Sequence, residues 1–163
     1  MIFMNMNYNL QLVPYTRDFL IRSWDWLNDE YVKYFTDTPD FTYKQQDEWF
    51  YNLEKDKYRI VWGVSYNGIP VGACGLKISA TGLNAEYWGY IGETTLYGKG
   101  IGNQMMESLE QKAINMGIKE LFLKVLFDNE RAIKLYMKRN FIEYQRDNRF
   151  IWMKKTLIRN ISL

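Results

Sequence analysis

The segment Leu96-Tyr97-Gly98-Lys99-Gly100-Ile101-Gly102-Asn103 has three glycines within five residues. It follows a strand-like run over residues 85–92 and leads into a helical pattern over residues 101–116. Glycines in such a turn let backbone N–H groups approach a phosphate closely, and the start of the next helix adds partial positive charge. The segment therefore predicts a binding site for a ligand that carries a diphosphate.

Strand and helix patterns alternate on both sides of this segment. We expect strands at residues 10–13, 58–66, 69–79, 85–92, 119–126, 142–147 and 149–156. We expect helices at residues 17–28, 43–54, 101–116 and 129–139, and a loop over residues 31–42. A mixed, mostly antiparallel sheet with helices on both faces accommodates this order. We therefore predict one α/β (α+β) domain over residues 8–157, with terminal extensions at 1–7 and 158–163.

The composition is that of a globular protein without an obvious nucleic-acid or membrane partner. Of the 163 residues, 47% are hydrophobic and 17% aromatic, which argues against disorder. The 21 Lys and Arg nearly balance the 19 Asp and Glu, and no basic run is present, so nucleic acid is not expected as a partner. No apolar stretch approaches the roughly 20 residues of a membrane span. Residues 1–6 do not read as a signal peptide, so we expect a cytoplasmic location.

Several catalytic chemistries are excluded by residue types that the chain lacks. It contains no histidine, which rules out Ser-His-Asp and Cys-His nucleophiles and every His-ligated metal site. Its one cysteine, Cys74, lies in an apolar run and is expected to be a buried small hydrophobe. No metal site is expected. The glycine segment also lacks the Gly-Lys-Ser/Thr ending of a Walker loop, so a nucleotide-hydrolysing site is disfavoured.

The glycine segment resembles a family signature. Tyr97-Gly98-Lys99-Gly100-Ile101-Gly102 is similar to the Gln/Arg-x-x-Gly-x-Gly/Ala motif of the GNAT superfamily, the acetyl-CoA-dependent N-acyltransferases. Both signature glycines, Gly100 and Gly102, are present. Tyr97 stands where the family has Gln or Arg, which removes one polar side chain from the phosphate side and leaves the backbone donors in place.

A second resemblance lies downstream, over residues 129–141. This stretch, NERAIKLYMKRNF, is similar to the family pattern Asn-x-x-Ala-x-x-Leu-Tyr-x-Lys-x-Gly-Phe. Asn140 replaces the glycine, a mild change because Asn tolerates a left-handed backbone. The order of strands and helices also matches, so the resemblance covers the chain from Leu10 to Thr156.

The resemblance implies acetyl-CoA as the co-substrate. It assigns coenzyme contacts to Tyr90, Ile91, Gly92, Tyr97, Gly98, Lys99, Gly100, Ile101, Gly102, Asn103 and Asn129. In the family, backbone donors of the glycine loop hold the diphosphate, and Lys99 is expected to add charge. An N–H near Ile91 would polarise the acetyl carbonyl, and Gly92 would pair with the pantetheine amides. Asn129 would contact the pantetheine arm, or serve as an ordinary N-cap.

Glu86 and Tyr136 are the expected catalytic residues. Glu86 lies eleven residues before Tyr97, where many relatives place the general base, and it shares a strand face with Trp88 and Tyr90. The alternatives are that Glu86 is a solvated carboxylate, or that Glu93 is the base. Tyr136 matches the family tyrosine that protonates the leaving thiolate; alternatively it is only a core aromatic.

The acceptor is the least constrained part of the interpretation. Aromatic and polar candidates for its site are Trp24, Trp26, Asn28, Tyr34, Phe35, Trp49, Tyr144, Phe150 and Trp152. The segment Trp24–Val32 is similar to two subgroups, one acting on N-termini of ribosomal proteins and one on nucleotide-linked amino sugars. The aromatic content favours a small amine such as an amino-sugar nucleotide.

The sequence is also compatible with other acceptors and with a non-catalytic function. A protein N-terminus or lysine is one rival acceptor, and an antibiotic amine or a polyamine is another. A polyamine would need acidic partners, for which five candidates exist: Glu30, Asp37, Asp40, Asp47 and Glu48. A non-catalytic acyl-CoA-binding module is the alternative of a different class. An exposed sheet edge is expected to permit a homodimer.

Overall fold

One sheet forms the centre of the computed structural model, which describes residues 9–158. Within these residues it has seven strands: β1 Leu10–Pro14, β2 Arg59–Tyr66, β3 Ile69–Ile78, β4 Asn84–Ile91, β5 Glu120–Leu126, β6 Ile142–Arg146 and β7 Phe150–Thr156. They are ordered β1-β2-β3-β4-β5-β7-β6, and only the β4–β5 pair is parallel. The predicted extensions at 1–7 and 158–163 lie outside the described residues, apart from Ile158.

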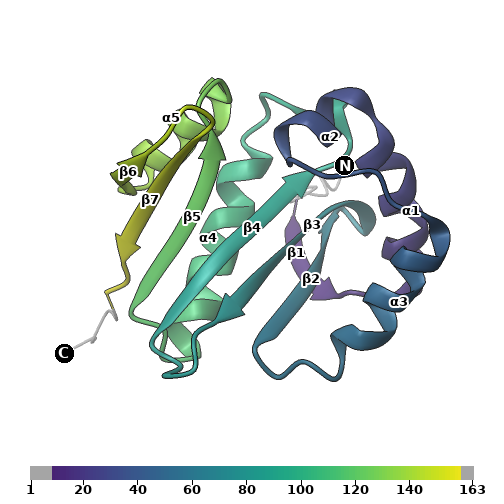
Figure 1. Cartoon of the computed structure of the whole chain (residues 1–163), viewed down its shortest axis with the longest axis horizontal. Helices are drawn as coiled ribbons and strands as arrows, with labels where there is room; N and C mark the ends of the chain where they lie inside the picture. Colours follow the sequence, from purple (N-terminus) through teal and green to yellow (C-terminus); the bar gives the residue numbers. More distant parts are fainter. Residues whose placement is uncertain (1–8, 159–163) are drawn as a thin grey trace, which may run out of the picture.

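Helices cover both faces of this sheet, as predicted (Figure 1). The helices α1 Arg17–Asn28, α2 Glu30–Phe35 and α3 Tyr43–Leu53 come before the β2–β4 meander, and α4 Ile101–Asn115 and α5 Glu130–Lys138 come after it. Phe19 of α1 packs against Gly63 of β2, where a Cβ atom would lie 2.3 Å from its ring. On the opposite face, Met106 and Leu109 of α4 are fully buried in the main core. The glycine segment thus leads into α4, and the second motif forms α5.

Local sequence signals fix several of the boundaries. Asn67 and Gly68 have φ angles of 53° and 79° and close the β2–β3 hairpin as the dipeptide predicts. Thr42 and Gln45 form a capping box at the start of α3. Asn140, which replaces the family glycine, has a φ of 72°, so the expected left-handed backbone is present.

The predicted loop over residues 31–42 is wrong in its first part, because Glu30–Phe35 is helical. The Asp29 carboxylate accepts hydrogen bonds from the Tyr31 and Val32 amides at 3.1 and 3.0 Å and so caps α2. Val32 is buried under this helix, with 2% of its surface exposed. Tertiary burial and a cap stabilise six residues that are too short to show a helical period in the sequence.

The strands β4 and β5 separate after a short stretch of pairing. Their register consists of Asn84 with Glu120, Ala85 with Leu121 and Glu86 with Phe122. Beyond Glu86, β4 continues to pair with β3, and β5 continues to pair with β7. Figure 1 shows the two strands side by side at one end and apart at the other. The sheet thus opens in its middle, beside the glycine segment.

Cys74 lies in β3 and is completely buried, which confirms the expected role as a small core residue. Burial raises the pKa of its thiol far above the ordinary value, so it stays protonated. Among residues 9–158, no three His, Cys, Asp or Glu side chains come together as metal ligands. In the same range no helix combines the length and apolarity that crossing a bilayer requires.

Candidate active site

A cavity of about 770 Å³ occupies the opening between β4 and β5. Its walls come from segments far apart in the sequence: the α1–α3 region, residues 86–91 of β4, the glycine loop, and the start and middle of α5. Most of the predicted site residues line it, namely Glu86, Tyr90, Ile91, Tyr97, Gly98, Gly100, Ile101, Gly102, Asn103, Asn129 and Tyr136. Gly92, Lys99 and Glu93 do not.

The glycine loop has the geometry of an anion cradle. Gly98 and Gly100 have φ angles of 79° and 75°, a left-handed backbone that side chains rarely adopt, and open space surrounds both. The first turn of α4 begins directly afterwards, and its first hydrogen bond runs from the Gln104 amide to the Gly100 carbonyl at 3.1 Å. The amides of Ile101, Gly102 and Asn103 precede that bond and have no acceptor within the helix. These residues therefore fit a diphosphate.

The other members of the loop have distinct roles. Ile101 is buried, so it offers only its backbone to a ligand. Gly102 is small for packing, because a Cβ atom there would lie 3.3 Å from Leu135 of α5. The Asn103 side chain accepts a hydrogen bond from Arg139 at 3.1 Å. Lys99 is exposed. Asn129 caps α5 by accepting from the Ala132 amide at 3.4 Å, which confirms the N-cap; it also lines the cavity, and its contact with pantetheine stays a prediction.

Backbone groups of β4 face the opening at alternate residues. The Gly92 amide donates to the Val71 carbonyl at 2.7 Å, which makes Ile91 and Gly72 a non-hydrogen-bonded pair. The amides of Gly92 and Tyr90 therefore face β3, whereas those of Ile91 and Gly89 face the opening. The expected donor at Ile91 is suitably directed. The Gly92 amide is not directed at the opening, and Gly92 instead makes room for the Trp26 ring.

Tyr136 is buried beneath the cavity next to a second tyrosine, Tyr87 of β4. Their rings meet edge to face, with centroids 6.2 Å apart. Burial raises the pKa of Tyr136 to about 12, although the contact with Tyr87 lowers it in part. The Tyr136 phenol is therefore protonated at neutral pH and able to donate.

Sequence reasoning missed Tyr87, although strand alternation could have found it. It lies next to Glu86 and so points to the opposite face of β4, toward α4 and α5. Its hydroxyl passes over Gly89, where a Cβ atom would lie only 2.4 Å away. The glycine at this position is thus needed for Tyr87 to reach Tyr136.

The two candidate bases differ in what surrounds them. Glu86 is exposed, lines the cavity, and is the last residue of β4 that pairs with β5. Trp88 and Tyr90 share its face and stack with centroids 6.5 Å apart. The Glu93 carboxylate instead accepts a hydrogen bond from the Trp26 indole at 2.9 Å and lies outside the cavity wall. Glu86 is therefore better placed to meet a substrate.

The part of the cavity under α1–α3 is aromatic and neutral. Of the predicted acceptor residues, Phe35 and Trp49 line it, whereas Trp24 stacks on Tyr43 with centroids 3.7 Å apart, outside the wall. A hydroxyl and amide network was not predicted: Gln46 donates to Ser23 at 2.9 Å, and Tyr15 donates to Ser23 at 3.3 Å. This end of the cavity thus combines aromatic faces with uncharged polar groups.

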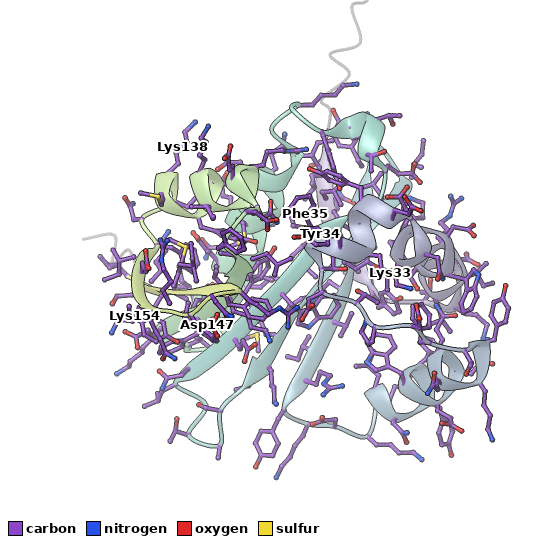
Figure 2. All side chains as sticks on the ribbon, turned by 45° about the horizontal axis from the view of Figure 1, so that its top comes forward. Lys33, Tyr34, Phe35, Lys138, Asp147 and Lys154 are labelled. Carbon is purple, nitrogen blue, oxygen red and sulfur yellow. The ribbon has the colours of Figure 1, made fainter. Side chains whose placement is uncertain are left out.

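Polar contacts tie α2 to the far side of the opening. The Tyr34 hydroxyl donates to the Asp128 carboxylate at 2.5 Å, and Arg149 pairs with Asp37 at 2.8 Å. Figure 2 shows Tyr34 and Phe35 at the end of α2 that faces the α5 side of the molecule. The α1–α3 region is therefore fastened across the gap that β4 and β5 leave.

Solved structures with this fold include several acetyltransferases. A domain from Methanocaldococcus jannaschii is 21% identical, with a TM-score of 0.79, covering 93% of this chain and 100% of that one. Spermidine N-acetyltransferase from Vibrio cholerae, solved with CoA and spermine, is 17% identical, with a TM-score of 0.83 and coverages of 91% and 95%. The N-acetyltransferase PseH from Campylobacter jejuni, solved with acetyl coenzyme A, is 17% identical, with a TM-score of 0.70 and coverages of 91% and 99%.

These identities are low, so the structural likeness establishes the fold alone. No curated protein sequence matches the chain. The sequence model of the acetyltransferase (GNAT) family, however, matches residues 20–141, which is most of the chain and includes both motifs. The chain therefore belongs to the acetyltransferase (GNAT) family, which confirms the predicted fold, the enzyme class and acetyl-CoA as co-substrate.

Proposed function

We propose that this acetyltransferase moves the acetyl group of acetyl-CoA to a primary amine by direct attack within a ternary complex. The cavity between β4 and β5 is the observation that carries this proposal. It places the diphosphate cradle, the buried Tyr136 phenol and the Glu86 carboxylate around one space. Glu86 reaches the cavity from β4 and Tyr136 reaches it from α5. One side chain can therefore act on the attacking amine and the other on the leaving thiolate.

Each residue has a defined part in the transfer. Glu86 takes a proton from the attacking ammonium or amine, directly or through water, because an amine with a pKa near 10 is protonated at neutral pH. The Ile91 amide polarises the acetyl carbonyl as the C–N bond forms. Tyr136 gives its proton to sulfur as the C–S bond breaks. Burial raises its pKa, so the phenol is still protonated at neutral pH and its proton is present when the thiolate leaves.

The acceptor that we propose is a small amine such as a nucleotide-linked amino sugar. Aromatic faces of Trp49 and Trp88 suit a sugar or base ring, and the Ser23–Gln46 network offers uncharged hydrogen-bonding groups to hydroxyls. A protein N-terminus of the ribosomal-protein type is the second candidate.

A polyamine acceptor is disfavoured by the charges of the site. Four of the five acidic candidates are paired with cations: Asp37 with Arg149, Asp40 with Lys33, Asp47 with Arg17 and Glu48 with Lys44. Only Glu30 lacks an ion-pair partner among the described residues. A multiply charged amine is bound best by several free carboxylates, and four of these five already have a cationic partner.

The proposal is tested by coenzyme A release with a panel of amines. The panel contains a nucleotide-linked amino sugar, a peptide with a free N-terminus, an aminoglycoside and spermidine. The Glu86→Gln and Tyr136→Phe variants are each expected to lower kcat by about 10²- to 10⁴-fold, the usual contribution of a general acid or base. Glu93→Gln serves as the rival, and Glu143→Gln, an exposed glutamate on β6, serves as the control.

Each outcome has a clear meaning. If Glu86→Gln and Tyr136→Phe retain full activity, the assigned mechanism is wrong. If Glu93→Gln alone loses activity while its fold is retained, Glu93 is the base. If the chain binds coenzyme A but acetylates no amine, the non-catalytic module is the correct interpretation.

A further inference from the structure

Tyr97 stands at the signature position where the family has Gln or Arg, and its polar atom is engaged elsewhere. The Tyr97 hydroxyl donates to the Ile91 carbonyl at the end of β4, at 2.9 Å. Its ring is partly buried and also meets the Tyr31 ring, with centroids 5.8 Å apart. The side chain therefore forms an apolar wall beside the glycine loop and offers it no free donor.

A cation from another part of the chain lies on this wall. The guanidinium carbon of Arg131, in the first turn of α5, is 3.9 Å from the centroid of the Tyr97 ring. A guanidinium stacked on a ring uses its flat face and leaves its in-plane N–H donors available. Arg131 lines the same cavity as Gly98 and Gly100, and no carboxylate pairs with it among the described residues.

The position of Arg131 relative to the loop is set by helix packing. The α5 helix begins at Asn129, which caps it, and it contacts the first turn of α4 at Gly102, opposite Leu135. Arg131 lies one turn before Leu135 on the same helix, and it lines the same cavity as Gly98, Gly100 and Gly102. A planar cation with five donors at this place suits the paired oxygens of a diphosphate.

We propose that Arg131, held against the Tyr97 ring, binds the diphosphate of the acyl-CoA in place of the polar side chain that the first motif position lacks. The inference rests on the proposed function. It adds a residue from α5 to a site that the motif assigns to the loop alone. Tyr97 acts as the platform and Arg131 as the charged group, so the two residues together replace one Gln or Arg.

The test is calorimetric titration with coenzyme A, which requires no turnover. The Arg131→Ala variant is expected to bind about 10- to 100-fold more weakly, the usual effect of losing a hydrogen bond to a charged group. Lys134→Ala is the matched control, because it removes an exposed cation from the same helix one turn later, outside the cavity wall. It is expected to change affinity less than about 3-fold.

Two further ligands identify the phosphate that Arg131 contacts. With 3′-dephospho-coenzyme A, the loss caused by Arg131→Ala is expected to persist. With pantetheine, which has no phosphate, it is expected to disappear. A loss seen only with intact coenzyme A would overturn the assignment, because Arg131 would then contact the 3′-phosphate.

A second substitution at Tyr97 tests whether Tyr97 and Arg131 together replace the family Gln or Arg. In the Arg131→Ala background, Tyr97→Arg returns the family residue and is expected to recover affinity to within a few-fold of the parent. Equal affinity of the parent and Arg131→Ala would overturn this inference and leave the acetyltransferase proposal intact. Failure of the parent itself to bind coenzyme A would instead refute the proposed function. Thermal melts confirm that each variant is folded.

Discussion

Glu110 of α4 is predicted to be the most sensitive charged residue in the structure. It is buried, with 8% of its side chain exposed, and it meets two cations. Arg139, at the end of α5, donates to both carboxylate oxygens at 3.2 and 2.7 Å, and Lys155 of β7 contacts both at 3.0 Å. Arg139 also donates to Asn103 in the first turn of α4. One carboxylate thus joins α4, α5 and β7 behind the coenzyme loop.

The expected cost follows from what Glu110→Gln would leave behind. Two cations, each with 17% of the side chain exposed, would lose their counter-charge while remaining largely out of water. Removing one member of a buried ion pair costs about 3–5 kcal/mol, and the partial exposure of both cations favours the lower end, about 3 kcal/mol. For a domain of this length, that corresponds to a fall in Tm of roughly 6–12 °C.

Urea unfolding followed by tryptophan fluorescence measures this free energy. Glu107→Gln, an exposed glutamate one turn earlier on α4, is the matched control and should cost less than about 0.5 kcal/mol. Replacing all three partners with apolar residues, as in Glu110→Leu, Arg139→Met and Lys155→Met, should restore most of the loss, because no unpaired charge remains. The reasoning is refuted if Glu110→Gln matches Glu107→Gln, or if the triple variant is less stable than Glu110→Gln.

Three further predictions concern groups around the site. Burial raises the Tyr136 pKa from 10.0 to about 12, so the folded state holds this proton more tightly than the unfolded state, and the resulting stabilisation is complete below pH 10 and is lost between pH 10 and 12. Over that range the parent should lose roughly 3 kcal/mol more unfolding free energy than Tyr136→Phe. Equal losses in the two proteins would contradict this prediction. Gly92→Ala should lower the unfolding free energy by about 1–3 kcal/mol in urea titrations, because its Cβ atom would lie 2.2 Å from the buried Trp26 ring; an unchanged midpoint would show that the ring can shift. Tyr34→Phe should leave the global free energy of unfolding nearly unchanged, since its bond to Asp128 is exposed, yet it should speed hydrogen exchange in α2. Unchanged exchange would mean that this bond does not fasten the helix.

Local signals predicted most of the helices and strands. The short helix α2, which was predicted as loop, was missed for a physical reason. The hairpin at Asn67-Gly68 and the start of α3 at Thr42 depend on residues that are neighbours in the chain, so the sequence contains the whole interaction. The α2 helix depends on burial of Val32 beneath it as well as on its Asp29 cap. Six residues with only one buried position do not show a helical period.

The residues of the candidate site that belong to a sequence motif were predicted, and those that only tertiary contacts bring to the site were missed. Tyr136 and the glycine loop belong to motifs of fixed spacing, and the structure places both on one cavity. Tyr87 and Arg131 carry no motif signal of their own. Each becomes significant only because it meets a predicted residue, Tyr136 in one case and Tyr97 in the other.

The sequence by itself determined the family, the glycine loop and the two candidate catalytic residues, because glycine geometry and motif spacing are properties of the chain alone. The tertiary structure decided the rest. The parting of β4 and β5 after Glu86 opens the cavity, while β4 stays paired with β3 and β5 with β7. Strand alternation then directs the Ile91 amide, and not that of Gly92, into the opening. Packing of α5 on α4 brings Arg131 to the loop, because a contact between distant segments exists only once the sheet has formed.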